Sequence, residues 1–344
     1  MSNRDNKDTL LLISRPYQGK DDGPHQIIHN LFNSGPITRT HIFYGGEILE
    51  PTEYQKVFAP KLQNLFSVYH QLAKEMMALH KNYKTIIVFG SFNVVFVLFS
   101  LLFSFKKKVL IIGYDSLTRT ALLNFKHSNA KESVRWACSL LKGYLIESII
   151  SALPVQTLFV SEGCLNFHRR LFRYLKPDAA AFACKPMDKP HAPKKVFSNK
   201  VVILGPCKTG LDYKNFRETI NELANNGFTE ENIILFGSGF VNVCCKAYTH
   251  ISYVKNFEEW AINIEHPIIS MRPRAPGIQT KIQRLILFGN SIFCIAPFDI
   301  YPLDSHLIRP VSDLRPDSEY QATVKDASNL KIKSTPSLER LRDA

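Results

Sequence analysis

The sequence lacks the residue patterns that most often build metal sites and structural disulfides. Its cysteines are scattered, mostly among apolar neighbours, and form neither a Cys-x-x-Cys pair nor the cysteine–histidine spacing of a zinc site. No Asp-x-Asp triplet occurs. We therefore expect no bound metal. We also expect the cysteines to be reduced core residues, namely Cys138, Cys164, Cys184, Cys207, Cys244, Cys245 and Cys294.

Long hydrophobic runs are also missing. The most apolar stretch, residues 91–105, offers about 15 residues before three lysines, whereas a membrane-spanning helix needs about 20. Two interpretations of this stretch remain: a buried helix, or an interfacial helix whose lysines meet anionic lipid. The first eight residues are polar and lack the apolar core of a signal peptide. We expect a cytoplasmic protein, with a peripheral position at the inner face of the membrane as a further expectation.

What is present is the composition of a folded protein with an excess of positive charge. Of 344 residues, 45% are hydrophobic and 21% are charged, which is enough apolar material for two domains with their own cores. Lysine and arginine number 43 against 30 aspartates and glutamates, a formal net charge of +13 at pH 7. This excess favours anionic partners. No nucleic-acid recognition motif occurs, so we expect nucleotides or an anionic membrane surface and no nucleic acid.

Short apolar runs alternate with amphipathic stretches along most of the chain, which is typical of parallel α/β sheets. The sequence predicts strands at residues 9–14, 37–44, 85–89, 109–113, 157–160, 201–204, 233–236, 250–254, 267–270 and 292–296. It predicts a pair of helices over residues 54–81, helices at residues 136–153, 165–175, 256–264, 278–288 and 317–329, and one that carries Phe216, Ile220 and Leu223.

Residues 184–200 contain three prolines and five lysines, so we expect an exposed linker without regular structure. The predicted organisation is an N-terminal domain over residues 1–183, this linker, a C-terminal domain over residues 201–330 and a flexible tail over residues 331–344. One predicted helix of the first domain is basic, because it carries Arg169, Arg170, Arg173 and Lys176. A solvated face and a membrane-facing patch are the two interpretations of that helix.

The most informative stretch is residues 270–296, which reads as loop, helix and strand. Two prolines remove backbone donors from residues 272–277, and apolar residues at helical spacing follow. Arg272, Arg274 and Lys281 lie close to the start of this helix, where backbone N–H groups and the helix dipole favour an anion. A phosphate site is one interpretation of the stretch. A basic surface loop before an ordinary amphipathic helix is the other.

This stretch resembles the donor-site segment of glycosyltransferase family 4 and of similar retaining GT-B transferases. The likeness runs through Pro276-Gly277-Ile278-Gln279-Thr280-Lys281-Ile282 and Phe288-Gly289-Asn290-Ser291-Ile292-Phe293. The resemblance implies an α/β chain with the GT-B fold, in which two Rossmann-like domains face a central cleft, the first on the acceptor side and the second on the nucleotide-sugar donor side. Arg284 departs from the pattern, because the family has there the glutamate that holds the donor ribose.

The same resemblance implies roles for residues in both domains. Tyr114 takes the place of a family histidine that reaches the sugar, and with Asp115 it is assigned to the catalytic site. The donor set comprises Lys208, Lys214, Tyr253, Val254, Arg272, Arg274, Gly277, Lys281 and Arg284. The acceptor set comprises Gly19, Asp22, Gly23 and His25. An ordinary turn also explains the acceptor set, because glycine and aspartate are common turn formers.

The function that the resemblance implies is transfer of a sugar from a nucleotide-sugar co-substrate to a cell-surface polysaccharide or a lipid-linked glycan. It implies retention of configuration without a metal or other cofactor, since cationic side chains and a helix N-terminus would neutralise the leaving diphosphate. The alternative is a non-catalytic GT-B-like binding or scaffold protein in glycan assembly, favoured by Tyr114, Arg284 and Pro206, the last standing where the family has an arginine. An epimerase of the same fold is less favoured, because no paired carboxylates for acid–base chemistry are evident.

Overall fold

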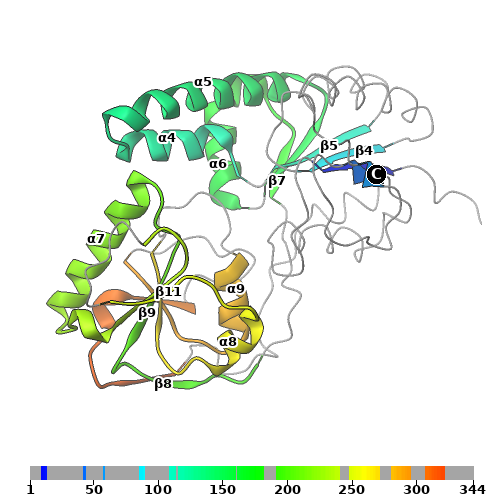
Figure 1. Cartoon of the computed structure of the whole chain (residues 1–344). Helices are drawn as coiled ribbons and strands as arrows, with labels where there is room; N and C mark the ends of the chain where they lie inside the picture. The colour runs from blue at the N-terminus through cyan, green and yellow to red at the C-terminus, as the bar shows by residue number, and fades with distance from the viewer. Residues whose placement is uncertain are drawn as a thin grey trace, which may run out of the picture. The chain divides into compact units, whose positions relative to one another are not determined.

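The chain divides into two compact units in the computed structural model (Figure 1). Unit 1 comprises Met1–Arg119, Ser139–Lys185 and Ser334–Ala344, and unit 2 comprises Thr120–Cys138 and Pro186–Lys333. The structure describes residues 9–13, 42–43, 57–58, 85–89, 108–113, 115–159, 161–181, 191–240, 248–271, 280–295 and 307–321. The domain boundaries that the sequence predicts stay predictions.

Among the described residues, unit 1 contains a seven-stranded sheet in which every pair is parallel. Its strand order is β3-β2-β1-β4-β5-β6-β7, so the order reverses between β1 and β4. The strands are β1 (Thr9–Ile13), β2 (Ile42–Phe43), β3 (Val57–Phe58), β4 (Thr85–Phe89), β5 (Lys108–Gly113), β6 (Gln156–Phe159) and β7 (Ala179–Ala181). The strand predicted at residues 85–89 is confirmed to the residue.

Three helices lie between β5 and β7, and side-chain caps fix where each begins. They are α4 (Leu117–His127), α5 (Ala130–Ala152) and α6 (Glu162–Leu171), and the 3₁₀ turn η2 (Arg173–Leu175) follows the last. The side-chain oxygens of Ser116, Asn129 and Ser161 accept backbone N–H groups of the first turns of α4, α5 and α6 at 2.9–3.1 Å. None of the helices in the described ranges is both long and apolar enough to cross a membrane.

The described part of unit 2 contains a six-stranded parallel sheet in the order β11-β10-β9-β12-β13-β14. Its strands are β9 (Val201–Leu204), β10 (Ile233–Phe236), β11 (Thr249–Ile251), β12 (Ile268–Ser270), β13 (Ile292–Cys294) and β14 (Ile308–Pro310). The helical segments are α7 (Gly210–Asn225), η3 (Glu230–Asn232), α8 (Phe257–Asn263), α9 (Thr280–Leu287) and η6 (Val311–Asp313). A separate antiparallel pair joins β8 (Lys195–Phe197) to β15 (Glu319–Gln321).

Helices cover both faces of the unit 2 sheet (Figure 1). Val202 and Leu204 face α8 and α9 in one buried cluster, whereas Val201 and Ile203 face α7 and η6 in the other. This alternation follows from the two-residue period of a strand. It explains why β9 is apolar at every position, since a strand buried on both faces has no polar side.

Three predicted assignments are wrong, and strand pairing explains each. β3 lies within the range predicted for a pair of helices, residues 54–81, because it extends the sheet beside β2. β15 lies within the helix predicted at residues 317–329, and its partner β8 lies in the linker for which no regular structure is expected. Val196 of β8 is fully buried, so the pair is anchored in the core. α4, β7 and β14 are present in the structure although no helix or strand is predicted for their residues.

Candidate functional site

The candidate site of unit 2 is the edge of its sheet at which the neighbouring strands β9 and β12 end. The strand order reverses between these two strands, with β10 and β11 beyond one and β13 and β14 beyond the other. In open parallel sheets, ligands bind outside the carboxyl ends of the strands at such a reversal. Residues 205–209 after β9, residues 237–240 after β10 and residues 252–256 after β11 all begin at this edge.

The segments after β9 and β10 are held together by backbone hydrogen bonds. The N–H of Gly205 donates to Phe236 O at 2.8 Å, and the N–H of Cys207 donates to Ser238 O at 3.0 Å. Gly239 has a φ of +92°, and a Cβ on it would lie 2.4 Å from Cys207 O, so only glycine fits there. The two loops therefore pack closely against each other at the carboxyl edge of the sheet. The sequence signal for it was Gly237-Ser238-Gly239, which in isolation is weak evidence for a ligand site.

The start of α7 carries its own anion, the side chain of Asp212. One oxygen of that carboxylate, Oδ2, accepts the backbone N–H groups of Lys208 and Thr209, each at 3.0 Å. In return Thr209 Oγ1 accepts the N–H of Asp212, which completes a capping box. The backbone N–H groups of Lys208 and Thr209 are therefore already used, whereas the side chain of Lys208 is exposed.

Two cations of the predicted donor set lie around one aromatic ring, where α8 and α9 begin. Lys281 Nζ lies 5.8 Å from the ring centroid of Phe257, and the Arg284 guanidinium carbon lies 5.2 Å from it. Arg284 also lies 5.6 Å from the ring of Phe288, and only 4% of its surface is exposed. An arginine stays charged even when buried, so α9 brings a fixed positive charge into the apolar layer beside the sheet.

The other described members of the predicted donor set lie at different positions. Tyr253 follows β11 at the carboxyl edge and is well exposed, whereas Val254 is partly buried against the cluster beneath α8. Lys214 lies on the exposed surface of α7, with its Nζ 3.9 Å from Glu218 Oε1. The structure therefore brings Lys281 and Arg284 together, while Lys214 pairs along its own helix.

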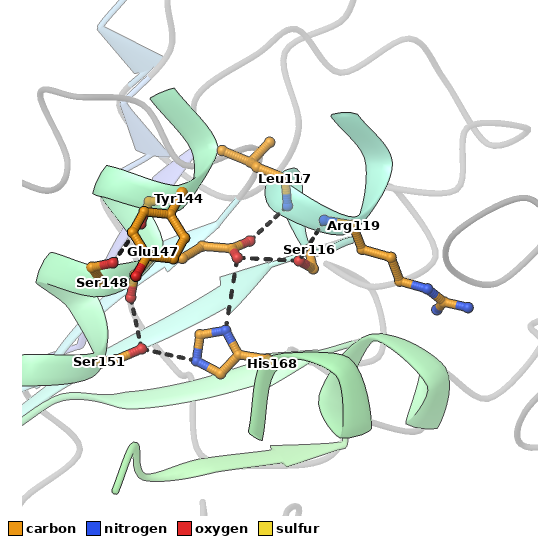
Figure 2. Close-up of polar contacts among 8 residues, drawn as sticks. All are labelled: Ser116, Leu117, Arg119, Tyr144, Glu147, Ser148, Ser151 and His168. Atoms are coloured by element: carbon orange, nitrogen blue, oxygen red, sulfur yellow. Dashed lines mark hydrogen bonds and ion pairs between the residues drawn. The ribbon is translucent and has the colours of Figure 1, made fainter. Parts of the chain in front are cut away.

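In unit 1 the residues that follow β5 are held by a buried polar network (Figure 2). Ser116 Oγ donates to Glu147 Oε2 at 3.1 Å, and the N–H of Leu117 donates to Glu147 Oε1 at 2.6 Å. His168 Nδ1 lies 3.9 Å from Glu147 Oε2, and its Nε2 lies 3.1 Å from Ser151 Oγ. Three helices thereby share a network that excludes solvent. Sequence reasoning missed it, although Glu147 and Ser151 are polar at i and i+4 on the buried side of a helix.

Asp115, the predicted catalytic residue that the structure describes, precedes this network and is half-buried. Burial raises the pKa of the neighbouring Cys164 thiol, and the negative charge of Asp115 adds to the effect. Cys164 is buried, as expected of a core cysteine, but the same expectation is wrong for Cys138, which is exposed. The remaining predicted site residues lie outside the described ranges: Gly19, Asp22, Gly23, His25, Tyr114, Arg272, Arg274 and Gly277.

No protein-family model matches the chain, and no curated protein matches it by sequence. Solved structures do match. WaaG, a glycosyltransferase of lipopolysaccharide biosynthesis, aligns over 83% of this chain and 80% of its own, with a TM-score of 0.50 at 7% identity. The UDP-GlcNAc 2-epimerase of Methanocaldococcus jannaschii aligns over 89% of both chains, with a TM-score of 0.46 at 13% identity.

A UGT transferase from Siraitia grosvenorii in complex with UDP aligns over 88% of this chain and 84% of its own, with a TM-score of 0.47 at 12% identity. Identities this low carry information about the fold alone. In the described residues, the seven-stranded and six-stranded sheets are both parallel and each has one reversal of strand order, as Rossmann-like units have. The chain is therefore an α/β protein with the GT-B fold.

Proposed function

We propose that the chain is a glycosyltransferase that moves a sugar from a nucleotide-sugar to a cell-surface polysaccharide or a lipid-linked glycan. In this proposal the reaction retains the configuration of the sugar and uses no metal or other cofactor. The protein works in the cytoplasm, at an anionic membrane surface. The nucleotide-sugar is a co-substrate that binds at the carboxyl edge of the unit 2 sheet.

The observation that carries this proposal is the cluster of Lys281, Arg284 and Phe257 at the start of α8 and α9. Charge must be compensated when a nucleoside diphosphate leaves the sugar, and fixed cations do this without reorganisation during the reaction. Arg284 is held in a layer with little solvent, where electrostatic interactions are stronger than in water. The exposed ring of Tyr253 at the same edge is suited to stack on a nucleobase.

In unit 1 the proposal assigns catalytic contact with the sugar to Tyr114 and Asp115. Support comes from the network of Glu147, which fixes Ser116 and Leu117 immediately after these two residues. A catalytic group must keep its position within fractions of an ångström, and a buried carboxylate that accepts two hydrogen bonds supplies such a support. Glu147 is in this view a positioning residue.

A non-catalytic binding or scaffold role is the second candidate, and the cap of α7 favours it. Asp212 takes the backbone N–H groups of Lys208 and Thr209, which in a phosphate-binding loop would face the ligand. A carboxylate there also repels a diphosphate. The two candidates differ in turnover, because the scaffold binds a nucleotide or a partner without releasing a sugar.

The test is a thermal-shift screen of the full chain with UDP, GDP, CMP and ADP and their common sugar conjugates, followed by product analysis with the nucleotide that binds. A ligand at a hundred times its Kd stabilises the folded state by about 2.7 kcal/mol, so a selective rise in Tm identifies the donor. Transfer or hydrolysis of the matching sugar supports the enzyme. Binding without turnover, or no shift with any nucleotide, supports the scaffold.

A further inference from the structure

α5 presents an uncovered apolar stripe along its outer side. Val134, Leu141, Leu145 and Ile149 are 68%, 62%, 52% and 40% exposed. Their spacing of seven, four and four residues places them on one face of the helix, within an arc of about 80° at 3.6 residues per turn. Cys138 is exposed on the same face. A stripe this long on a soluble protein marks an interaction surface, because apolar side chains normally face the core.

The opposite side of α5 is fixed, so the stripe is a permanent feature of the surface. Ile146 and Ile150 are buried, and Glu147 and Ser151 point into the network with Ser116 and His168 (Figure 2). Gly143 lies so close to α4 that a Cβ on it would meet Thr118 N at 3.0 Å. The helix cannot turn its stripe inward without breaking these contacts.

The well-exposed charges of α5 are all positive. Lys131, Arg135 and Lys142 are exposed and lie along one flank of the stripe, at 3.6 residues per turn. The two acids of the helix are turned away: Glu147 is fully buried, and Glu132 is half-buried with one carboxylate oxygen out of contact with solvent. An apolar face with a basic flank is the pattern of helices that lie in a membrane interface.

A second element extends this surface beside α5. The ring of Tyr144 lies 5.6 Å from the ring of Phe172, at the end of α6. The chain around Phe172 exposes Leu171, Tyr174 and Leu175 together with Arg170, Arg173 and Lys176. Residues 170–176 contain no acid, and the nearest acids along the chain, Glu162 and Asp178, are exposed. Tyrosine and arginine next to exposed leucines are typical of the lipid headgroup level.

We propose that the unit 1 part of the α5 stripe, Leu141, Leu145 and Ile149, forms with residues 170–176 one membrane-binding face that takes an anionic phospholipid bilayer. The leucines and isoleucine enter the boundary between headgroups and acyl chains, and the basic side chains meet lipid phosphates. A second copy of the chain is the poorer occupant, because this face offers no acid on α5 to pair with the basic flank of another copy.

This inference takes up the membrane partner of the proposed function and assigns it to a surface. Its test uses the full chain and no nucleotide-sugar, so the two proposals can fail separately. A protein that binds vesicles but transfers no sugar supports the membrane-binding face and contradicts the proposed enzyme. Transfer to a soluble acceptor without vesicle binding supports the enzyme and contradicts the membrane-binding face.

The experiment is flotation of the protein with vesicles of phosphatidylcholine alone or mixed with phosphatidylglycerol. We expect binding to the mixed vesicles that falls with added salt. The double variant Leu141→Gln/Leu145→Gln should bind about tenfold more weakly, since a polar amide replaces the branched apolar end of each leucine. Lys142→Gln and Arg173→Gln should each weaken binding about fivefold. All four residues are exposed, so these variants should fold.

Phe197→Gln is the matched control, because Phe197 is also an exposed apolar residue but lies on β8 of unit 2. It should bind vesicles as the wild type does. Equal binding of the Leu141→Gln/Leu145→Gln variant, equal binding to both vesicle types, or no binding by the wild type overturns the proposal. A wild-type protein that is a stable dimer in analytical ultracentrifugation, together with a monomeric double variant, also overturns the proposal. In that case a second copy of the chain covers the stripe.

Discussion

The carboxylate of Glu147 in the middle of α5 accepts the backbone N–H of Leu117 at 2.6 Å, from a residue 30 positions earlier in the chain. The same carboxylate accepts Ser116 Oγ through its other oxygen at 3.1 Å. The Glu147 side chain therefore supplies the acceptor that the first backbone N–H of α4 lacks within its own helix. It also ties that start to the helix whose outer side carries the exposed apolar stripe.

Replacing Glu147 with alanine should lower the free energy of unfolding by about 2–4 kcal/mol. The change leaves the N–H of Leu117 and the hydroxyl of Ser116 buried without an acceptor. Urea denaturation followed by circular dichroism measures the loss. Glu147→Gln keeps one acceptor oxygen and should cost less than half as much. Equal losses in the two variants would mean that the negative charge, and not the acceptor, is what the network needs.

Replacing Gly239 with alanine should destabilise unit 2 by more than the same change at Gly227. Both glycines have positive φ, +92° and +94°, so both variants carry about 1–2 kcal/mol of backbone strain. Only at Gly239 does a Cβ also meet backbone, at 2.4 Å from Cys207 O, whereas at Gly227 its nearest contact is a Pro316 side-chain atom at 3.6 Å. The difference in Tm between the two variants measures the cost of the steric clash at Gly239, because the backbone strain is similar in both. Equal Tm values would show that the loops separate readily.

In the proposed glycosyltransferase, replacing Lys281 with alanine or Arg284 with methionine should weaken binding of the nucleotide-sugar by about 1–3 kcal/mol each. Calorimetric titration with the nucleotide found in the thermal-shift screen measures the change. Lys200→Ala is the control, because Lys200 is exposed and precedes β9, at the opposite end of that strand from the candidate site. Unchanged affinity in both site variants removes the cluster around Phe257 from the donor site.

The stability of the protein should rise as the pH increases from about 8 to about 10.5 through Lys194. Burial lowers the pKa of Lys194 from 10.5 to about 8. Between these values the unfolded chain binds more protons than the folded one, so folding is favoured at the higher pH. Urea unfolding across this range should show a smaller rise for Lys194→Met than for the wild type.

Lys200→Met serves as the exposed control for that pH series and should keep the wild-type slope. The Lys194 ammonium also donates to Ala261 O at 2.6 Å and to Asn290 Oδ1 at 3.1 Å, so Lys194→Met should lower stability at every pH. A wild-type slope in Lys194→Met would mean that another group titrates in this window.

Much of the fold is predictable from the sequence because the buried parallel strands are continuous apolar runs. The runs at residues 85–89, 201–204 and 233–236 are strands to the residue. β7, three alanines, and β14, which ends in proline, have no such signal, because pairing with a neighbouring strand creates them. β8 and β15 show the same effect, since each becomes a strand only in the presence of the other.

The candidate site is predictable in part. The cations of α9 are visible in the sequence as a basic helix start, but the ring of Phe257 that they flank comes from α8 and enters only through tertiary packing. The Glu147 network is less visible, because its members come from three helices and each is an ordinary residue in its own segment. The spacing of residues in the sequence predicts which side chains are neighbours within one helix or strand, but it does not predict contacts between elements.

The β8–β15 pair has a consequence for synthesis of the chain. Ser198 beside β8 donates to Ser318 O beside β15 at 3.0 Å, across a separation of 120 residues. At a translation rate of about 5–20 residues per second, the ribosome completes β15 about 6–24 s after β8. During this interval β8 is an unpaired strand, and Val196 lacks its final burial. Pairing with β15, the last described strand of unit 2, is therefore what prevents β8 from associating with other nascent chains.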